Sequence, residues 1–287
     1  MTEGAYRLSL PARRTTSVVF ASPHSGRDYT GAFLAASVLD ERMIRTSEDA
    51  YVDDLLGGVP ALGAPLLAAT APRAYLDLNR AAEELDPSVV DGVRSFAHNP
   101  RVQSGLGVIP RVVAGGRAIY SGKITLAEAR GRIRNVWHPY HDCLARLLDE
   151  SRTMFGQAIL VDVHSMPHEA MDAIAHRAGT RPEIVLGDRY GAAAAGSIVE
   201  AVDAAFRAEG FRVSRNTPFA GAYIAQTYGR PGIGQHAVQV EIDRALYLDE
   251  QAIRPAPGFD AFRARLAKVL DRIAAIGRPA DLALAAE

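Results

Sequence analysis

The strongest constraint on the fold is the alternation, along the whole chain, of short apolar runs with longer amphipathic segments. The runs at residues 17–21, 157–163 and 237–242 are short and apolar, as expected of buried strands. The segments at 125–151, 188–209 and 259–276 carry apolar residues at helical spacing. Such alternation is typical of a parallel or mixed sheet flanked by helices. We therefore predict an α/β fold of three layers (α/β/α). A single domain over residues 1–287 is expected, because no repeat or linker interrupts the pattern.

Weaker patterns add further elements. Residues 32–44 have helical spacing, and a second short helix is predicted to start near Glu48 and Asp49 and to stop at Gly57. Glycine, proline and arginine are frequent between residues 81 and 120, so loops with short strands are expected there. Further short strands are predicted at residues 65–69, 73–78, 183–186 and 211–214.

Charge and cysteine content exclude several partners and cofactors. The 287 residues carry a formal net charge of -1 without a basic stripe, which argues against nucleic acid and anionic membranes as partners. Cys143 is the only cysteine, so neither an intramolecular disulfide nor a cysteine-based zinc cluster can form. The absence of disulfides favours a reducing compartment.

Targeting signals and several enzyme motifs are also absent from the sequence. The N-terminal segment lacks the apolar stretch of a secretory signal, and no run reaches the roughly 20 apolar residues of a membrane span. We expect a soluble, cytoplasmic protein, and the sequence predicts no oligomeric state. The chain has no G-x-S-x-G elbow, P-loop or dinucleotide fingerprint, which disfavours serine hydrolases and nucleotide-dependent enzymes.

Polar residues at the ends of the buried strands are the first indication of function. In open α/β sheets the ligand site lies beyond the carboxyl ends of the strands. His24 follows the first strand, His164 follows the run AILVDV, and Glu241 lies inside the apolar run VQVEID. Such groups are costly to bury without a partner. These three side chains are therefore candidates for one site.

Two histidines and one carboxylate form a ligand set that holds catalytic zinc and leaves a position open for water. Asp49 or Glu48 can supply the carboxylate. Zinc lowers the pKa of its bound water to about 7, and Glu241 is the natural group to take and return the proton. Asp162 lies two residues before His164 and shares its strand face, where it can orient the imidazole or bond a loop amide instead.

Plainer interpretations of these residues remain open. A histidine at a strand end is more often a hydrogen-bonded structural residue than a ligand, and Glu241 can pair with a buried arginine. His138 and His141 lie in the long predicted helix beside Pro139, which indicates a kink and favours a structural or surface role. The remaining histidines are weaker candidates: His98, His168, His176 and His236.

Four residues are candidates for binding an anionic substrate. Asn79 and Arg80 follow the predicted strand 73–78, and arginine can hold a carboxylate through two parallel hydrogen bonds. A salt bridge from Arg80 to the acidic residues around it is at least as common. Arg111 and Arg230 lie in glycine-rich loops, which line sites more often than they pack cores.

Seven short motifs follow one another along the chain. In order they are PHSGRDY, EDAYVDDL, DLNR, GVIPR, VDVHSMP, EIVLGD and VQVEIDRALYLDE. Together they resemble the N-formylglutamate amidohydrolase family over roughly residues 18–250, nearly the whole chain. The resemblance implies a fold similar to that of zinc carboxypeptidases and aspartoacylase-type deacylases, with a mixed central sheet between two layers of helices.

The resemblance also implies a role for single residues. It places a zinc ion (Zn2+) on His24, Asp49 and His164, and it gives Glu241 the position of the general base. The family usually has Thr-Asp or a similar pair where this chain has Glu48 before Asp49, so the third ligand stays open between the two carboxylates.

The resulting hypothesis is zinc-dependent hydrolysis of N-formyl-L-glutamate, or of a close N-acyl amino acid, to formate and the free amino acid. Asn79 and Arg80 would take the place of the pair that binds one carboxylate of the substrate, and Arg111 or Arg230 would bind the second carboxylate. The alternative among enzymes is a deacylase or peptidase for another acyl group. The alternative outside them is a non-catalytic relative that binds a metal or a ligand.

Overall fold

A mixed sheet of seven strands forms the centre of the molecule. The computed structural model describes residues 4–93, 99–172 and 181–279. Side by side, the strands are β1 (Tyr6–Ser9), β3 (Leu66–Ala69), β2 (Val18–Ser22), β4 (Ala158–Met166), β7 (Gln235–Asp243), β5 (Ile184–Gly187) and β6 (Val213–Arg215). β3, β2, β4 and β7 are mutually parallel, β1 and β5 pair antiparallel with β3 and β7, and β6 is parallel to β5. The carboxyl ends of four neighbouring strands therefore meet at one edge.

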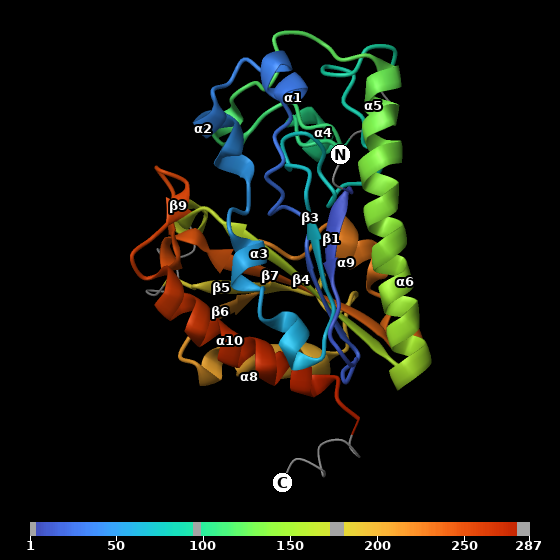
Figure 1. Ribbon diagram of the computed structural model, residues 1–287, viewed down its shortest axis with the longest axis vertical. Coiled ribbons are helices and arrows are strands. Elements are labelled where there is room, and N and C mark those ends of the chain that lie inside the picture. The colour runs from blue at the N-terminus through green and yellow to red at the C-terminus, as the bar shows by residue number, and fades with distance from the viewer. Residues whose placement is uncertain (1–3, 94–98, 173–180, 280–287) are drawn as a thin grey trace.

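Helices cover both faces of this sheet (Figure 1). One face carries α6 (His138–Phe155) and α9 (Tyr223–Tyr228), and the other carries α3 (Val52–Leu55), α8 (Gly196–Ala208) and α10 (Phe259–Ile276). The predicted three-layer α/β/α fold with a mixed sheet is confirmed. The other α-helices and strands among the described residues are α1 (Gly31–Ala36), α2 (Glu41–Ile44), α4 (Pro100–Gln103), α5 (Leu126–Arg132) and the small two-stranded sheet of β8 (Leu248–Asp249) and β9 (Arg254–Pro255).

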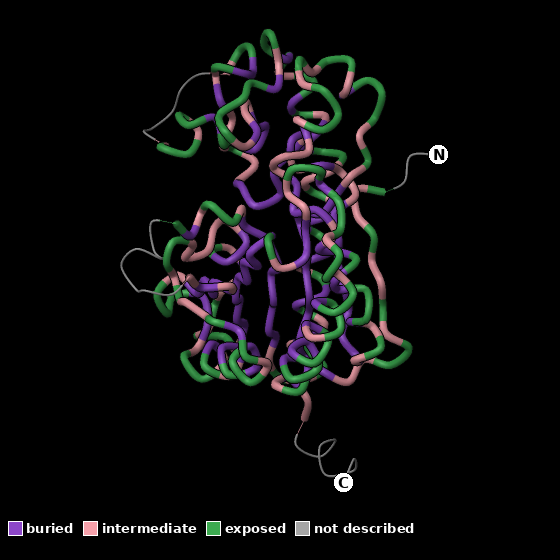
Figure 2. Tube along the Cα trace, turned by 90° about the vertical axis from the view of Figure 1, so that its left-hand side faces the viewer, coloured by how far each residue is buried: buried purple, intermediate pink, exposed green. Residues whose placement is uncertain are grey.

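Alternation along the strands builds two cores, one on each face. Val18 and Phe20 pack with the α8 and α10 layer, whereas Val19 and Ala21 pack with the α6 layer. All four are fully buried, and the buried trace runs through the middle of the molecule in Figure 2. Burial of each large apolar side chain contributes about 1.5–3 kcal/mol to the stability of the fold, so the side chains along these strands need no polar partners.

Most predicted strands and the C-terminal helix are present, and five predicted segments differ. The helix expected at 32–44 is divided into α1 and α2, because Asp40 caps a new helix by accepting from Met43 N. The helix expected from Glu48 begins only at Val52, after Tyr51 in a left-handed conformation (φ 63°). The expected loops at 81–120 contain α4 and single bridges in place of short strands.

The other two differences arise from side chains that bond their own backbone. Residues 73–78 form turns, and the predicted strand is wrong, because Asp77 Oδ1 accepts from Asn79 N (2.8 Å) and closes the chain on itself. The helix expected from Asp188 starts at Gly196, since Asp188 Oδ2 instead accepts from Gly191 N in a turn. Near Pro139 the helix continues from α5 into α6 through a π-helical turn, Ile133–Trp137.

Within the described part of the chain, no helix is both long and apolar enough to cross a membrane.

Candidate metal centre and substrate cavity

Three side chains from separate segments converge at the carboxyl edge of the sheet. His24 follows β2, His164 lies in β4, and Asp49 precedes α3; all three are buried. His164 Nδ1 lies 3.1 Å from both His24 Nδ1 and Asp49 Oδ2, and His24 Nδ1 lies 3.5 Å from Asp49 Oδ2. The structure thus brings together one nitrogen of each predicted histidine and one carboxylate oxygen.

The other nitrogen of each histidine fixes its tautomer. Nε2 of His24 lies 2.8 Å from Asp77 Oδ1, and Nε2 of His164 lies 2.9 Å from Asp162 Oδ2. Because an ionised carboxylate only accepts hydrogen bonds, we assign the proton of each neutral ring to Nε2. Both Nδ1 lone pairs then face Asp49 Oδ2, so three electron-pair donors converge on one point. Zinc fits this set, since tetrahedral ligands at about 2.0–2.1 Å from the ion lie roughly 3.3 Å apart.

The pKa values of the same groups show that the centre favours positive charge. Burial alone would lower the pKa of His164, but Asp162 and Asp49 raise it well above 6.5. Burial alone would raise the pKa of Asp49, but hydrogen bonds to His164 and His24 lower it well below 3.8. A proton or a metal ion can carry this positive charge, and metal binding would release the proton.

Geometry distinguishes Asp49 from Glu48. The second oxygen of Asp49 accepts from Arg244 (3.0 Å) and from Ser165 Oγ (3.3 Å), which leaves Oδ2 directed at the histidines. Glu48 is turned to Arg45, with both carboxylate oxygens in contact at 2.9 and 3.0 Å. Of the two carboxylates left open by the sequence, only Asp49 lies with the histidines.

Glu241 lies beside His164 on the neighbouring strand. The parallel register of β4 and β7 pairs His164 with Glu241 and Asp162 with Gln239. Gln239 Nε2 donates to Glu241 Oε1 (2.8 Å). Burial raises the pKa of Glu241 to about 7, with an opposing effect from His164. At neutral pH this carboxyl group can therefore both accept and donate a proton.

A cavity of about 560 Å³ opens onto these groups and collects arginines. His24, Asp49, His164 and Glu241 all contribute to its wall. Four arginines also line it, namely Arg73, Arg80, Arg101 and Arg244. This excess of cations fits an anionic substrate.

Asn79 and Arg80 line this cavity, on a loop whose backbone is held by hydrogen bonds. Arg80 Nε donates to Leu106 O (2.9 Å) and Arg80 Nη1 to Asn79 O (2.8 Å), which differs from the salt bridge weighed as its alternative. Trp137 Nε1 donates to Arg80 O (2.9 Å), and His141 Nε2 lies 2.9 Å from Leu78 O. The π-helical turn and α6 thus fix the backbone on both sides of Asn79.

Arg111 and Arg230 do not reach the cavity, which corrects their predicted position. Arg111 Nε donates to Asp86 Oδ2 (3.0 Å), so its side chain is directed away from the metal ligands. Arg230 bridges to Gln235 at the amino end of β7, whereas Glu241 lies near the carboxyl end of that strand. The sequence of a glycine-rich loop does not show at which end of the sheet the loop lies.

The other histidines that the structure describes lie outside the converging set. His141 is buried between Leu78 O and Tyr228 Oη, and burial lowers its pKa to about 4, which agrees with the structural role predicted for it. His168 pairs with Asp243 (2.7 Å), and His236 Nδ1 accepts from Ala195 N (3.3 Å). His98 and His176 fall outside the described residues.

Several contributors to the site were missed in the sequence, and Arg101 of the cavity wall is among them. Arg73 Nε donates to Asp77 Oδ2 (3.1 Å) and lies in none of the seven motifs. Arg244 holds Asp49 and lies in the last motif, where nothing in the sequence distinguishes it from its neighbours. Gln239 could have been found from its spacing in the sequence. It precedes Glu241 by two residues, as Asp162 precedes His164, and residues two apart share a strand face.

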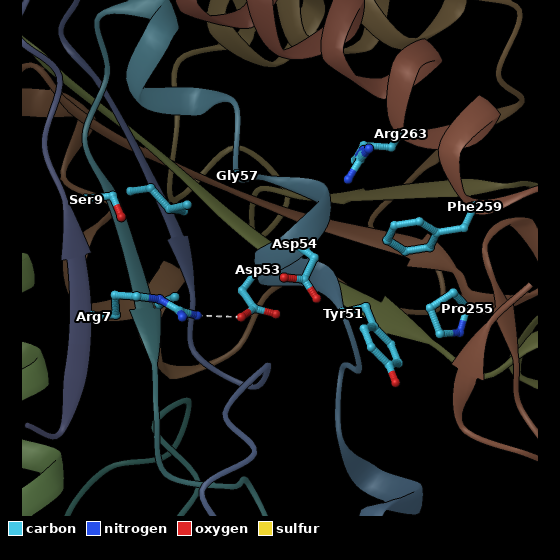
Figure 3. Close-up of a pocket in the computed structure, with 11 residues that line it drawn as sticks. Arg7, Ser9, Tyr51, Asp53, Asp54, Gly57, Pro255, Phe259 and Arg263 are labelled. Atoms are coloured by element: carbon cyan, nitrogen blue, oxygen red, sulfur yellow. Dashed lines mark hydrogen bonds and ion pairs between the residues drawn. The ribbon is translucent and has the colours of Figure 1, made fainter. Parts of the chain in front are cut away.

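A second cavity, of about 440 Å³, lies beside α3 between β1 and α10 (Figure 3). Both carboxylates in its wall have arginine partners: Asp53 Oδ2 accepts from Arg7 (2.6 Å) and Arg27 (3.2 Å), and Arg27 also binds Asp54 (3.1 Å). The other oxygen of Asp53, Oδ1, is buried without a hydrogen-bond partner among the described residues. Among the described residues that line it there is no histidine. It offers no ligand set like that of the first cavity.

Comparison with known proteins identifies the family. Residues 16–248 match the family described as N-formylglutamate amidohydrolase. The chain belongs to this family. Membership confirms the resemblance seen in the seven motifs and, with it, the predicted class of enzyme, an amidohydrolase.

Individual members of the N-formylglutamate amidohydrolase family are similar over almost the whole chain. An N-formylglutamate deformylase of Pseudomonas aeruginosa is 33% identical over 273 residues, which cover 93% of this chain and 96% of that protein. One of Pseudomonas putida is 29% identical over 240 residues, covering 81% and 82%. The crystal structure of N-formylglutamate amidohydrolase from Ralstonia eutropha JMP134 superposes with a TM-score of 0.89 at 32% identity, covering 96% of this chain and 99% of that one.

Proposed function

We propose that this protein is a zinc-dependent deformylase that hydrolyses N-formyl-L-glutamate to formate and L-glutamate. The observation that carries the proposal is the convergence of His24, Asp49, His164 and Glu241 on one arginine-lined cavity. The two Pseudomonas relatives named N-formylglutamate deformylase support the choice of acyl group and amino acid.

His24, Asp49 and His164 would hold the zinc ion, and Arg244 with Ser165 would keep Asp49 in place. Zinc held there supplies Lewis acidity, which polarises a carbonyl group and makes water acidic enough to attack at neutral pH.

Glu241 would move the proton. It takes a proton from the attacking water as the new C–O bond forms, and it returns this proton to the nitrogen as the C–N bond breaks. A pKa of about 7 suits both steps, because the group must be a base in the first and an acid in the second. The hydrogen bond from Gln239 would hold the carboxylate in position.

Two arginines would bind the negative charges of the reacting molecule. Burial lowers the pKa of Arg73, but the acidic groups Asp77, Asp49 and Glu241 raise it, so the guanidinium stays charged close to the metal ligands. There it would stabilise the negative charge that develops on the carbonyl oxygen of the substrate. Arg80 would bind the α-carboxylate from the loop that Trp137 fixes, and Asn79, whose Oδ1 accepts from Ile224 N, would hold that loop to α9.

The test compares two substrates that differ only in the acyl group. We expect the zinc-loaded protein to release formate from N-formyl-L-glutamate much faster than acetate from N-acetyl-L-glutamate. Faster release of acetate would assign a deacylase of another specificity. Binding of either compound without turnover would indicate a non-catalytic relative.

A further inference from the structure

Arg101 is a cation at the cavity wall that no described residue pairs with. Its guanidinium has no hydrogen-bond or ion-pair partner among the residues that the structure describes, although the residue lines the cavity. Arg244 differs, since its three nitrogens donate to Ser165, Thr46 and Asp49. The charge of Arg101 is therefore available to a ligand.

The backbone that carries Arg101 is nevertheless held in place. The side chain of Asn99 caps α4 by accepting from Arg101 N (3.0 Å) and Val102 N (3.3 Å). Arg101 O accepts from Leu106 N (2.8 Å), and Leu106 O accepts from Arg80 Nε (2.9 Å). One short segment thus ties the position of Arg101 to that of Arg80.

The two arginines lie close enough to repel each other. Burial lowers the pKa of Arg80, and the charges of Arg73 and Arg101 lower it further, against the attraction of Asp77. Asp77 is already bonded by His24 and Arg73. A ligand with a single carboxylate would pair with Arg80 and leave Arg101 unneutralised, whereas a dicarboxylate can satisfy both.

We propose that Arg101 selects the side-chain carboxylate of the substrate and thereby sets the preference for acyl derivatives of acidic amino acids over neutral ones. This inference rests on the proposed function, in which Arg80 binds the α-carboxylate. Arg101 is exposed at the cavity wall, so its attraction is screened by salt, and the preference weakens as ionic strength rises.

The experiment measures kcat and KM of wild type and Arg101→Gln with N-formyl-L-glutamate and with its neutral isostere N-formyl-L-glutamine. We expect Arg101→Gln to lower kcat/KM for the glutamate compound roughly tenfold or more, mainly through KM, because a charged hydrogen bond is lost. The glutamine compound should be hardly affected. Arg101→Lys should recover part of the preference, and Arg230→Gln, an exposed arginine away from the cavity, is the matched control.

An equal fall for both substrates, or none for either, would overturn the role of Arg101. Calorimetric binding of L-glutamate and L-glutamine gives a readout that does not depend on the acyl group. If wild type hydrolyses neither formyl compound, the proposed function fails. The role of Arg101 then still stands or falls on whether Arg101→Gln removes a preference for L-glutamate binding.

Discussion

The two cavities beside the segment 49–54 have comparable size and both carry carboxylates and arginines, yet only one is equipped for chemistry. Asp49 lines the first, whereas Asp53 and Asp54 line the second. In the second cavity the carboxylates are paired with arginines, Asp53 with Arg7 and Arg27, and Asp54 with Arg27, which lies outside the wall of that cavity. In the first, two imidazole lone pairs and a carboxylate oxygen point at one another, and the guanidinium of Arg101 has no partner among the described residues. Unpaired groups that converge, rather than volume or charge, distinguish a site.

The largest effect is expected from removing a converging ligand. His164→Ala should lose the metal and reduce activity by about 10³-fold or more, because both the Lewis acid and the polarised water depend on it. Asp77→Asn leaves all three ligands in place and disturbs only the orientation of His24, so a loss of roughly 10–100-fold is expected. Metal content and kcat/KM measured together separate the two cases. Full activity of His164→Ala without bound metal would exclude the proposed centre.

Glu241→Gln keeps the size of the side chain but removes the base. We expect zinc to remain bound and kcat to fall by roughly 10²–10⁴-fold. Loss of zinc along with activity would instead make Glu241 a ligand, and normal turnover would remove it from the mechanism.

Activity should depend on pH in the direction set by Glu241. Burial raises the pKa of Glu241 to about 7 in the metal-free chain, and the positive charge of zinc opposes this rise. A general base must be deprotonated, so kcat/KM should fall about tenfold per pH unit below the pKa. Gln239→Leu removes a hydrogen bond to the charged form and should move this acid limb to higher pH. If the acid limb of the pH profile stays at the same pH in this variant, a group other than Glu241 titrates.

The smallest effect is expected in the second cavity. Burial raises the pKa of Asp53 despite Arg27 and Arg7, so the folded protein binds its proton more tightly than the unfolded chain does. The stability that Asp53 contributes is therefore present at low pH and lost as pH rises through its folded pKa. Asp53→Asn should leave activity unchanged and should not lower the melting temperature at neutral pH. A large loss of activity would show that the two cavities are coupled through α3.

The site residues in or directly after strands were easier to predict from the sequence than those in loops. His24, His164 and Glu241 could be found because apolar runs mark strand ends and parallel strands end at one edge. Periodicity says nothing of where a loop residue points, so Arg111 seemed as good a candidate as Arg80.

The fold shows the same division. The strands β2, β4 and β7 and the helix α10 were predictable from continuous burial and helical spacing. The turn at residues 73–78 depends on one side chain, Asp77, which bonds Asn79 N and His24 Nε2 instead of extending a strand. Glu48 and Asp49 are adjacent, and only tertiary contacts with Arg45 and Arg244 separate their roles.

The most direct test of this account is the metal content of the purified protein, with formate release from N-formyl-L-glutamate followed before chelation, after it, and after zinc is restored. The account predicts close to one zinc per chain, loss of formate release on chelation, and its recovery with zinc. Full activity in protein that holds no metal would contradict the central claim, that the convergence of His24, Asp49 and His164 is a catalytic metal centre.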